Sequence, residues 1–227
     1  EYQGLGLLGG MAHAADLPRQ LFLFALSFFL PISILRYLWT FSMLTLGPLG
    51  VYVFLNHFFL KHKFDRQTIH FASFLSGLFY LLNLTTVQHF FTPFEAFTAF
   101  YGFFPWLIVG LFSFLAQPTF RRFLILFLLN FLASPAYYTE TIFIVYGLCV
   151  LIILADNIIS SRHRHHSLAE SLAALTTIGL SNAYWLLPTI FFVATNGGVG
   201  LAAKINTIAT PETYYRNLAF GNLPNIT

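Results

Sequence analysis

Residues 94–116 read FEAFTAFYGFFPWLIVGLFSFLA, and this stretch decides the fold. Its only charged residue is Glu95, close to where the stretch begins. About 20 consecutive apolar residues in a helix are long enough to cross the hydrocarbon core of a bilayer, which is about 30 Å thick. The stretch therefore predicts a transmembrane helix.

The composition of the whole chain extends this prediction. Of its 227 residues, 57% are hydrophobic, 19% are aromatic and only 8% are charged. Soluble domains carry about a quarter charged residues, so this chain could not cover a water-facing surface with them. The composition excludes a soluble enzyme, a disordered tail and a nucleic-acid-binding module. It makes the lipid bilayer the first expected partner of the protein.

Five further apolar runs predict further crossings. They cover residues 34–60, 68–87, 122–134, 139–155 and 168–193. None shows the alternation of a β-barrel strand, so we predict an all-α, polytopic membrane protein with about six transmembrane helices. Residues 20–30 are also apolar, but they are too few to cross, and Pro31 ends the run. They predict an interfacial or re-entrant helix, with an additional crossing as the alternative.

Lysine and arginine mark every second loop between these runs. The basic residues of the three loops are Lys61, Lys63, Arg66, Arg121, Arg122, Arg162 and Arg164. The short loops at 88–93 and 135–138 contain neither Lys nor Arg. Cytoplasmic loops are enriched in these residues, so the basic loops are predicted to face the cytoplasm. This topology gives a multi-pass protein of the cell membrane in which both ends of the sequence are exoplasmic.

The two ends differ in composition from the middle. Residues 1–193 are predicted to form the helical transmembrane domain, with an exoplasmic lead-in at 1–33. Residues 194–227 contain turn formers such as Asn196-Gly197-Gly198 and are predicted to form an exoplasmic loop. The sequence begins without a methionine. We expect it to be the interior of a longer protein, in which the last segment continues.

Polar side chains within the runs lie near the predicted outer ends. The candidates for substrate binding are Arg36, Glu95, Tyr138, Glu140, Asn182 and Tyr184. An ionisable group at the centre of a transmembrane helix costs at least about 2.5 kcal/mol, so the positions of such groups are informative. We expect these side chains to line one water-filled cavity that opens outward. Interfacial anchoring is the alternative for each tyrosine.

The charged candidates have structural alternatives as well. Glu140 follows Thr139, which could cap a helix whose first turn favours a carboxylate; binding of a cation or a sugar hydroxyl is the functional alternative. Arg36 could extend to the outer interface, or it could pair with the phosphate of a lipid-linked substrate. His13 and Asp16 could share a metal ion, but two ligands make a weak site, so no metal ligands are predicted.

Three short segments carry a resemblance to a known family. They are GLGLLGG at residues 4–10, SPAY at 134–137 and NAYWLLP at 182–188. With these segments the chain resembles the GT-C superfamily of polytopic membrane glycosyltransferases, in particular its arabinofuranosyltransferase-like members. The resemblance covers most of the chain, as an interior fragment of such a protein.

The resemblance implies a function. Members of this superfamily transfer a sugar from a polyprenyl-phosphate-linked donor to a glycan acceptor on the exoplasmic face, and they invert the anomeric centre. Cationic groups or a divalent cation would stabilise the departing phosphate. The catalytic carboxylate of the family lies early in the first exoplasmic loop, which places it upstream of Glu1. Asp16 is then the one catalytic candidate in the present lead-in.

Two other functions compete with this one. A transporter or flippase for a lipid-linked or polar substrate would carry charges or broken helices near the middle of the bilayer, whereas the centres of these runs are apolar. A non-catalytic membrane subunit would need no polar cluster at its outer face.

Overall fold

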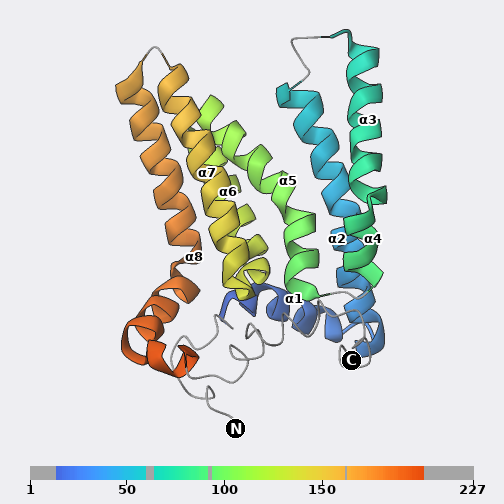
Figure 1. The fold of residues 1–227 in the computed structure, drawn as a ribbon. Coiled ribbons are helices and arrows are strands. Elements are labelled where there is room, and N and C mark those ends of the chain that lie inside the picture. Colours follow the sequence, from blue (N-terminus) through green and yellow to red (C-terminus); the bar gives the residue numbers. More distant parts are fainter. Residues whose placement is uncertain (1–13, 60–63, 92–93, 162, 202–227) are drawn as a thin grey trace, which may run out of the picture.

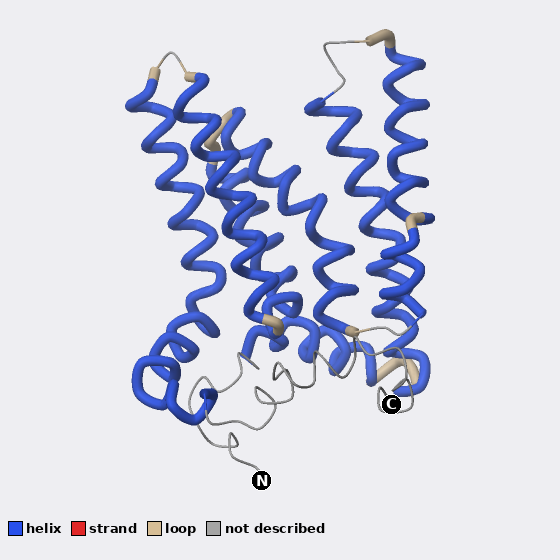
Figure 2. The backbone as a smooth tube through the Cα atoms, in the orientation of Figure 1, coloured by secondary structure: helices blue, strands red, loops and turns tan. Residues whose placement is uncertain are grey.

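The computed structural model describes residues 14–59, 64–91, 94–161 and 163–201, and helices account for nearly all of them (Figure 1). The elements are, in chain order, α1 (Leu17–Ser27), α2 (Ile32–Phe54), the π-helix η2 (Leu55–Phe59), α3 (Arg66–Leu82), α4 (Leu84–Phe91), α5 (Glu95–Ala116), α6 (Phe120–Ala133), the 3₁₀-helix η3 (Ser134–Tyr138), α7 (Glu140–Ser160) and α8 (Arg164–Leu201). No strand occurs in the described ranges (Figure 2). The predicted all-α class is confirmed.

Five helical segments of the described chain are long and apolar enough to cross a membrane. They are Ser33–Phe58, Glu95–Ala116, Phe120–Tyr138, Glu140–Ser160 and Arg164–Thr195. Large apolar side chains such as Phe41, Leu128 and Ile152 are exposed on these segments, as contact with lipid tails requires. The chain is thus a multi-pass helical membrane protein, as predicted.

The described residues that flank the three basic loops lie at one end of the bundle, which we call the basic end. The start of α3, the α5–α6 connection and the α7–α8 connection all lie at the top of Figure 1. Their described basic residues are Arg66, Arg121, Arg122 and Arg164. The others, Lys61, Lys63 and Arg162, lie outside the described residues. The predicted alternation of the helices is confirmed, and the assignment of the basic end to the cytoplasm stays a prediction.

The predicted interfacial helix is α1, which lies across the opposite end of the bundle and does not cross it (Figure 1). Pro18 at its start is buried against the bundle, whereas Phe22, Phe24 and Phe28 are exposed. An exposed apolar face on a helix at the end of a membrane bundle suits the boundary between head groups and acyl chains. This orientation favours the interfacial helix over an additional crossing by residues 20–30.

The segment 68–87, which was predicted to cross, is not among the five candidate segments and consists of two helices. α3 ends at Leu82, Asn83 has the extended angles φ −71° and ψ 154°, and α4 begins at Leu84. The two helices follow one another along the same path (Figure 1). The prediction of one continuous helix is wrong. The side chain of Asn83 forms hydrogen bonds with nearby backbone groups, and these bonds compete with the hydrogen bonds of a continuous helix. Its Oδ1 accepts a hydrogen bond from the N–H of Thr86 (3.0 Å) at the start of α4.

The polar groups freed by this break find partners inside the protein. The carbonyl oxygen of Tyr80 accepts hydrogen bonds from Asn83 Nδ2 (2.7 Å), Thr86 Oγ1 (2.8 Å) and Tyr101 OH (3.2 Å). In return, Tyr80 OH donates to the carbonyl of Tyr101 (3.0 Å), and the two rings stack with centroids 4.5 Å apart. Unsatisfied backbone groups in a bilayer cost several kcal/mol each, so these contacts make the break possible.

Close packing between α2 and α5 builds the framework beside α1. A Cβ atom on Gly102 of α5 would lie only 3.0 Å from the Cα atom of Met43 on α2, so glycine lets the two backbones approach this closely. Small residues at helix contacts are typical of membrane proteins, where close packing holds helices together. Trp106 fixes the same contact, because its Nε1 donates to the carbonyl of Leu46 (2.9 Å).

The last three predicted runs lie in longer elements. η3 extends the run at 122–134 to Tyr138, and α7 extends the run at 139–155 to Ser160. α8 continues to Leu201, so the loop predicted to begin at residue 194 begins later. Each added residue of an existing helix gains a hydrogen bond, which outweighs the weak local preference of Asn and Gly for turns. Residues 202–227 lie outside the described residues.

Candidate functional site

A cavity of about 330 Å³ lies beside α1, and we call it the polar pocket. The residues that line it come from the starts of α1 and α5 and from η3: Asp16, Arg19, Phe94, Glu95, Ala96, Pro135 and Tyr138. These elements meet at the end of the bundle opposite the basic end (Figure 1). The pocket therefore lies at the end that the charge distribution predicts to be exoplasmic.

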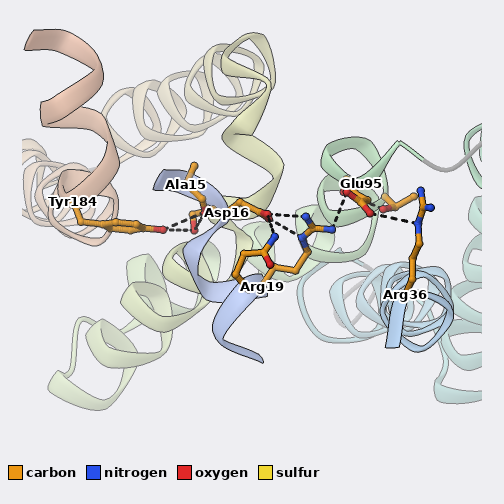
Figure 3. Close-up of polar contacts among 9 residues, drawn as sticks. Ala15, Asp16, Arg19, Arg36, Glu95 and Tyr184 are labelled. Carbon is orange, nitrogen blue, oxygen red and sulfur yellow. Dashed lines mark hydrogen bonds and ion pairs between the residues drawn. The ribbon is translucent and has the colours of Figure 1, made fainter. Parts of the chain in front are cut away.

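A chain of ion pairs connects three helices at this pocket (Figure 3). Arg19 in α1 donates two hydrogen bonds to Asp16, from Nε (2.7 Å) and from Nη2 (2.6 Å). Its Nη1 lies 2.9 Å from Oε2 of Glu95 in α5. Nε of Arg36 in α2 lies 3.5 Å from Oε1 of the same carboxylate. Two guanidinium groups therefore share Glu95.

The sequence places the two carboxylates at helix starts. Asp16 is the N-cap residue of α1, but its carboxylate binds the side chains of Arg19 and Gln20 (Nε2 to Oδ2, 2.6 Å) and makes no capping hydrogen bond. Its spacing of three residues from Arg19 puts both side chains on one face of the helix. Glu95 is the first residue of α5, where the helix dipole favours a negative charge.

Burial decreases along the chain of ion pairs. The exposed fraction of the side chain is 11% for Arg19, 39% for Glu95 and 70% for Arg36. Burial lowers the pKa of Arg19, but the hydrogen bond and charge of Asp16, together with the charge of Glu95, outweigh this effect and raise the pKa above its ordinary value. Arg19 is thus a fixed positive charge, whereas Arg36 has room to change partners.

A second set of hydrogen bonds holds the start of α1. Ser134 Oγ donates to the carbonyl of Ala15 (2.9 Å), and Tyr184 OH donates to the same oxygen (3.3 Å). The two hydroxyl oxygens lie 2.6 Å apart. Figure 3 shows Tyr184 and Ala15 on the far side of Asp16 from Glu95. α1 is therefore attached to α6–η3 and α8 at its start, and to α5 through Arg19.

Most of the predicted site residues meet here. Asp16, Glu95 and Tyr138 line the polar pocket, and Arg36 joins them through Glu95. Tyr184 is connected to the same place through the backbone of Ala15. The structure thus brings five candidates to one end of α1, and their roles in binding or catalysis stay predictions.

Two candidates lie elsewhere. Glu140 begins α7 with an exposed side chain, and Thr139 before it makes no capping hydrogen bond, so the expected cap is not formed. Asn182 is completely buried in α8. Its Nδ2 donates to the carbonyl of Ile178 (2.9 Å), and its Oδ1 accepts from Nε1 of Trp185 (2.8 Å). These contacts give Asn182 a part in packing rather than a place at the polar pocket.

Two residues of the site do not follow from the sequence candidates. Arg19 is the centre of the ion-pair chain, and its sequence signal is the spacing of three residues from Asp16 in an otherwise apolar segment. Ser134 has no local signal of this kind, because its contact with Ala15 joins residues 119 positions apart.

The positive charge at the pocket comes from arginine. Among the described residues, no three His, Cys, Asp or Glu side chains lie close enough together to hold a metal ion. Asp16 and Glu95, the two carboxylates of the pocket, both bind Arg19. His13, the other half of the weak metal pair considered from the sequence, lies outside the described residues.

A second cavity, which we call the apolar groove, also borders α1. Its volume is about 420 Å³, and its lining is mainly apolar: Pro18, Phe22, Trp39, Ser42, Met43, Thr45, Leu46, Phe103 and Leu132. Pro18 and Phe22 of α1 contribute to the groove, whereas Arg19 between them contributes to the polar pocket. One short helix therefore borders both a charged cavity and an apolar one.

Comparisons with known proteins give no relative. No protein-family model matches the chain, and neither a curated protein nor a solved structure matches it significantly.

Proposed function

We propose that the protein is part of a membrane glycosyltransferase that transfers a sugar from a polyprenyl-phosphate-linked donor to a glycan acceptor at the exoplasmic face. The observation that carries the proposal is the pairing of the two cavities beside α1. One holds a carboxylate shared by two arginines, and the other is lined by apolar side chains. The donor has a charged sugar phosphate, which would suit the polar pocket, and a hydrocarbon chain, which would suit the apolar groove.

The arginines suit the phosphate of such a donor. The guanidinium group is planar, always charged, and binds phosphate oxygens through two parallel hydrogen bonds. Arg19 is held in place by Asp16, and Arg36 is exposed enough to reach a ligand. When the bond from the sugar to the phosphate breaks, the phosphate gains one negative charge. Charged groups that are already in place stabilise that charge most effectively.

Glu95 is the best placed base in the described part of the chain. Both Glu95 and Asp16 line the pocket, but the side chain of Glu95 is 39% exposed and that of Asp16 only 17%, so an acceptor hydroxyl reaches Glu95 more readily. In the proposed step, the acceptor hydroxyl oxygen forms a bond to the anomeric carbon, the bond from that carbon to the phosphate oxygen breaks, and Glu95 takes the hydroxyl proton. Asp16 acts as a positioning residue for Arg19.

The proposal is tested by assaying transfer from polyprenyl-phosphate sugars in liposomes that contain the protein. Glu95→Gln keeps the shape of the side chain but cannot accept the proton, so we expect transfer to fall by about 10²- to 10⁴-fold. Glu170→Gln, which removes the same charge from α8 near the basic end, is the matched control and should keep wild-type activity. Equal activities of the two variants would remove Glu95 from the reaction.

The transporter or flippase alternative gains one observation, because the α3–α4 break is an interrupted helix of the kind such proteins use. The groups around the break, however, are uncharged and bind one another. Uptake of a labelled polyprenyl-phosphate sugar across the liposome membrane, without transfer of its sugar, would favour this alternative.

A further inference from the structure

Glu95 lies where an anionic ligand of the two arginines would lie. Its Oε2 is 2.9 Å from Nη1 of Arg19, and its Oε1 is 3.5 Å from Nε of Arg36. Each carboxylate oxygen thus faces a different guanidinium group, as two oxygens of a bound phosphate would. Among the described residues this is the only ion pair of Arg36.

We propose that Glu95 occupies the place between Arg19 and Arg36 that a phosphate monoester takes when it binds, so that carboxylate and phosphate compete for the same two guanidinium groups. The phosphate monoester belongs to the proposed reaction as its leaving group, so the biological meaning of this exchange rests on the proposed function. The competition itself is a property of the three side chains.

The exchange is favourable for reasons of charge and solvation. A phosphate monoester carries a charge of about −1.5 to −2 near neutral pH and offers three strong acceptor oxygens, against one charge and two oxygens in a carboxylate. Glu95 is 39% exposed, so water can solvate it once it is displaced. Arg19 stays in place during the exchange because Asp16 holds it with two hydrogen bonds.

The exchange would also keep the charge of the pocket constant during sugar transfer. Glu95 changes from −1 to 0 when it takes the proton of the acceptor hydroxyl. The phosphate changes from −1 in the donor to −2 in the leaving group as the bond to the sugar breaks. A neutral carboxylic acid binds guanidinium weakly, so both arginines turn to the phosphate at the moment at which its charge rises.

The first test measures the binding of geranyl phosphate, a sugar-free phosphate monoester with a short prenyl chain, by calorimetry on the protein in detergent. Glu95→Gln removes the competing charge, so we expect its Kd to fall by about five- to tenfold relative to wild type. The same substitution at Glu170, near the basic end, should leave the Kd unchanged. A Kd for Glu95→Gln equal to or above that of wild type overturns the proposal, as does the absence of binding.

The second test uses Arg36, whose side chain is 70% exposed and can be replaced with little risk to folding. Arg36→Gln should raise the Kd for geranyl phosphate by at least about fivefold, because a charge-assisted contact is lost. Arg121→Gln, which changes another exposed arginine, at the basic end, is the control. Inorganic phosphate as a second probe separates recognition of the phosphate from recognition of the prenyl chain. Equal affinities of the two variants for both probes contradict the proposal.

The binding test and the transfer assay can fail separately. Tighter binding by Glu95→Gln with unchanged sugar transfer would support the competition between Glu95 and phosphate but show that Glu95 is not the base. Loss of transfer with unchanged binding would support the proposed function but contradict the competition between Glu95 and phosphate. Only the combination of tighter binding and lost transfer supports both.

Discussion

The α3–α4 break and the polar pocket are two polar regions of one apolar bundle, and they use their hydrogen-bonding groups differently. At the break, Asn83 and Tyr101 bond to the carbonyl of Tyr80, and the groups satisfy one another. At the polar pocket, Glu95 and Arg36 form an ion pair, and the side chain of Arg36 is 70% exposed, so it can still bind a ligand.

Polar clusters in a membrane protein do not all indicate a functional site. A polar group in lipid must find a hydrogen-bond partner inside the protein. A polar cluster by itself therefore indicates only that backbone or side-chain groups needed such partners. Charged groups that border a cavity and remain exposed can also bind a ligand. By this measure the break is structural, and the polar pocket is the functional candidate.

The largest expected effect on stability comes from the centre of the ion-pair chain. Arg19→Met keeps much of the side-chain volume but leaves Asp16 and Glu95 as neighbouring negative charges without their shared partner. We expect the free energy of unfolding to fall by about 2 kcal/mol, less than for a fully buried pair because both carboxylates are partly exposed. Unfolding in mixed micelles measures it. A matched Arg121→Met variant should unfold like wild type, and equal stabilities of all three proteins would show that the chain of ion pairs does not hold α1.

A smaller effect is expected at the break. Asn83→Leu removes the hydrogen bonds to Thr86 and Tyr80, so we expect a loss of about 1–2 kcal/mol in the free energy of unfolding. Sugar transfer per folded molecule should be unchanged, because the break takes no part in the proposed reaction. Loss of transfer in a stably folded Asn83→Leu protein would reverse the assignment of the two regions and favour a transporter-like role for the break.

The smallest effect is a pH-dependent one at the start of α3. Hydrogen bonds from the side chain and the N–H of Thr68 lower the pKa of Asp65, which caps this helix. A lowered pKa stabilises the folded state above the unfolded pKa of about 3.9, and this contribution is lost as the pH falls through the folded pKa. Asp65→Ala should therefore speed amide hydrogen exchange in the first turn of α3 at pH 6.

The comparison at low pH checks this explanation. As the pH falls through the lowered pKa of Asp65 in the folded state, the carboxylate becomes protonated, and the difference in exchange between the two proteins should narrow. A difference that does not narrow on acidification would mean that the charge of Asp65 has no part in capping α3.

Much of the fold follows from the sequence because lipid imposes simple rules. The length of the apolar runs predicts the helices, and the spacing of arginines such as Arg121 and Arg164 predicts their alternation. The break at Asn83 is not predicted by hydropathy, because the apolar composition of residues 68–87 suits one helix as well as two. The break also depends on contacts that satisfy the freed backbone groups, and one partner in these contacts, Tyr101, belongs to a helix that comes later in the chain.

The site is predictable only in part, for a similar reason. Arg36 and Glu95 stand out because charge is rare in this chain and both lie near predicted helix ends. Asn182 stands out equally but points into the protein, since the rotation of α8 is set by the packing of Trp185 and its neighbours. Hydropathy predicts which residues are in a helix, whereas tertiary packing decides which way each one faces.

Cysteine labelling in intact cells can show whether the polar pocket opens to the exoplasmic side. Cys149 is the only cysteine, so a Cys149→Ser background allows single cysteines to be placed at Tyr138 beside the pocket or at Arg164 at the basic end. We predict that an impermeant maleimide labels position 138 in intact cells and position 164 only after permeabilisation. Labelling of position 164 in intact cells, with position 138 protected, would place the pocket in the cytoplasm and contradict the account.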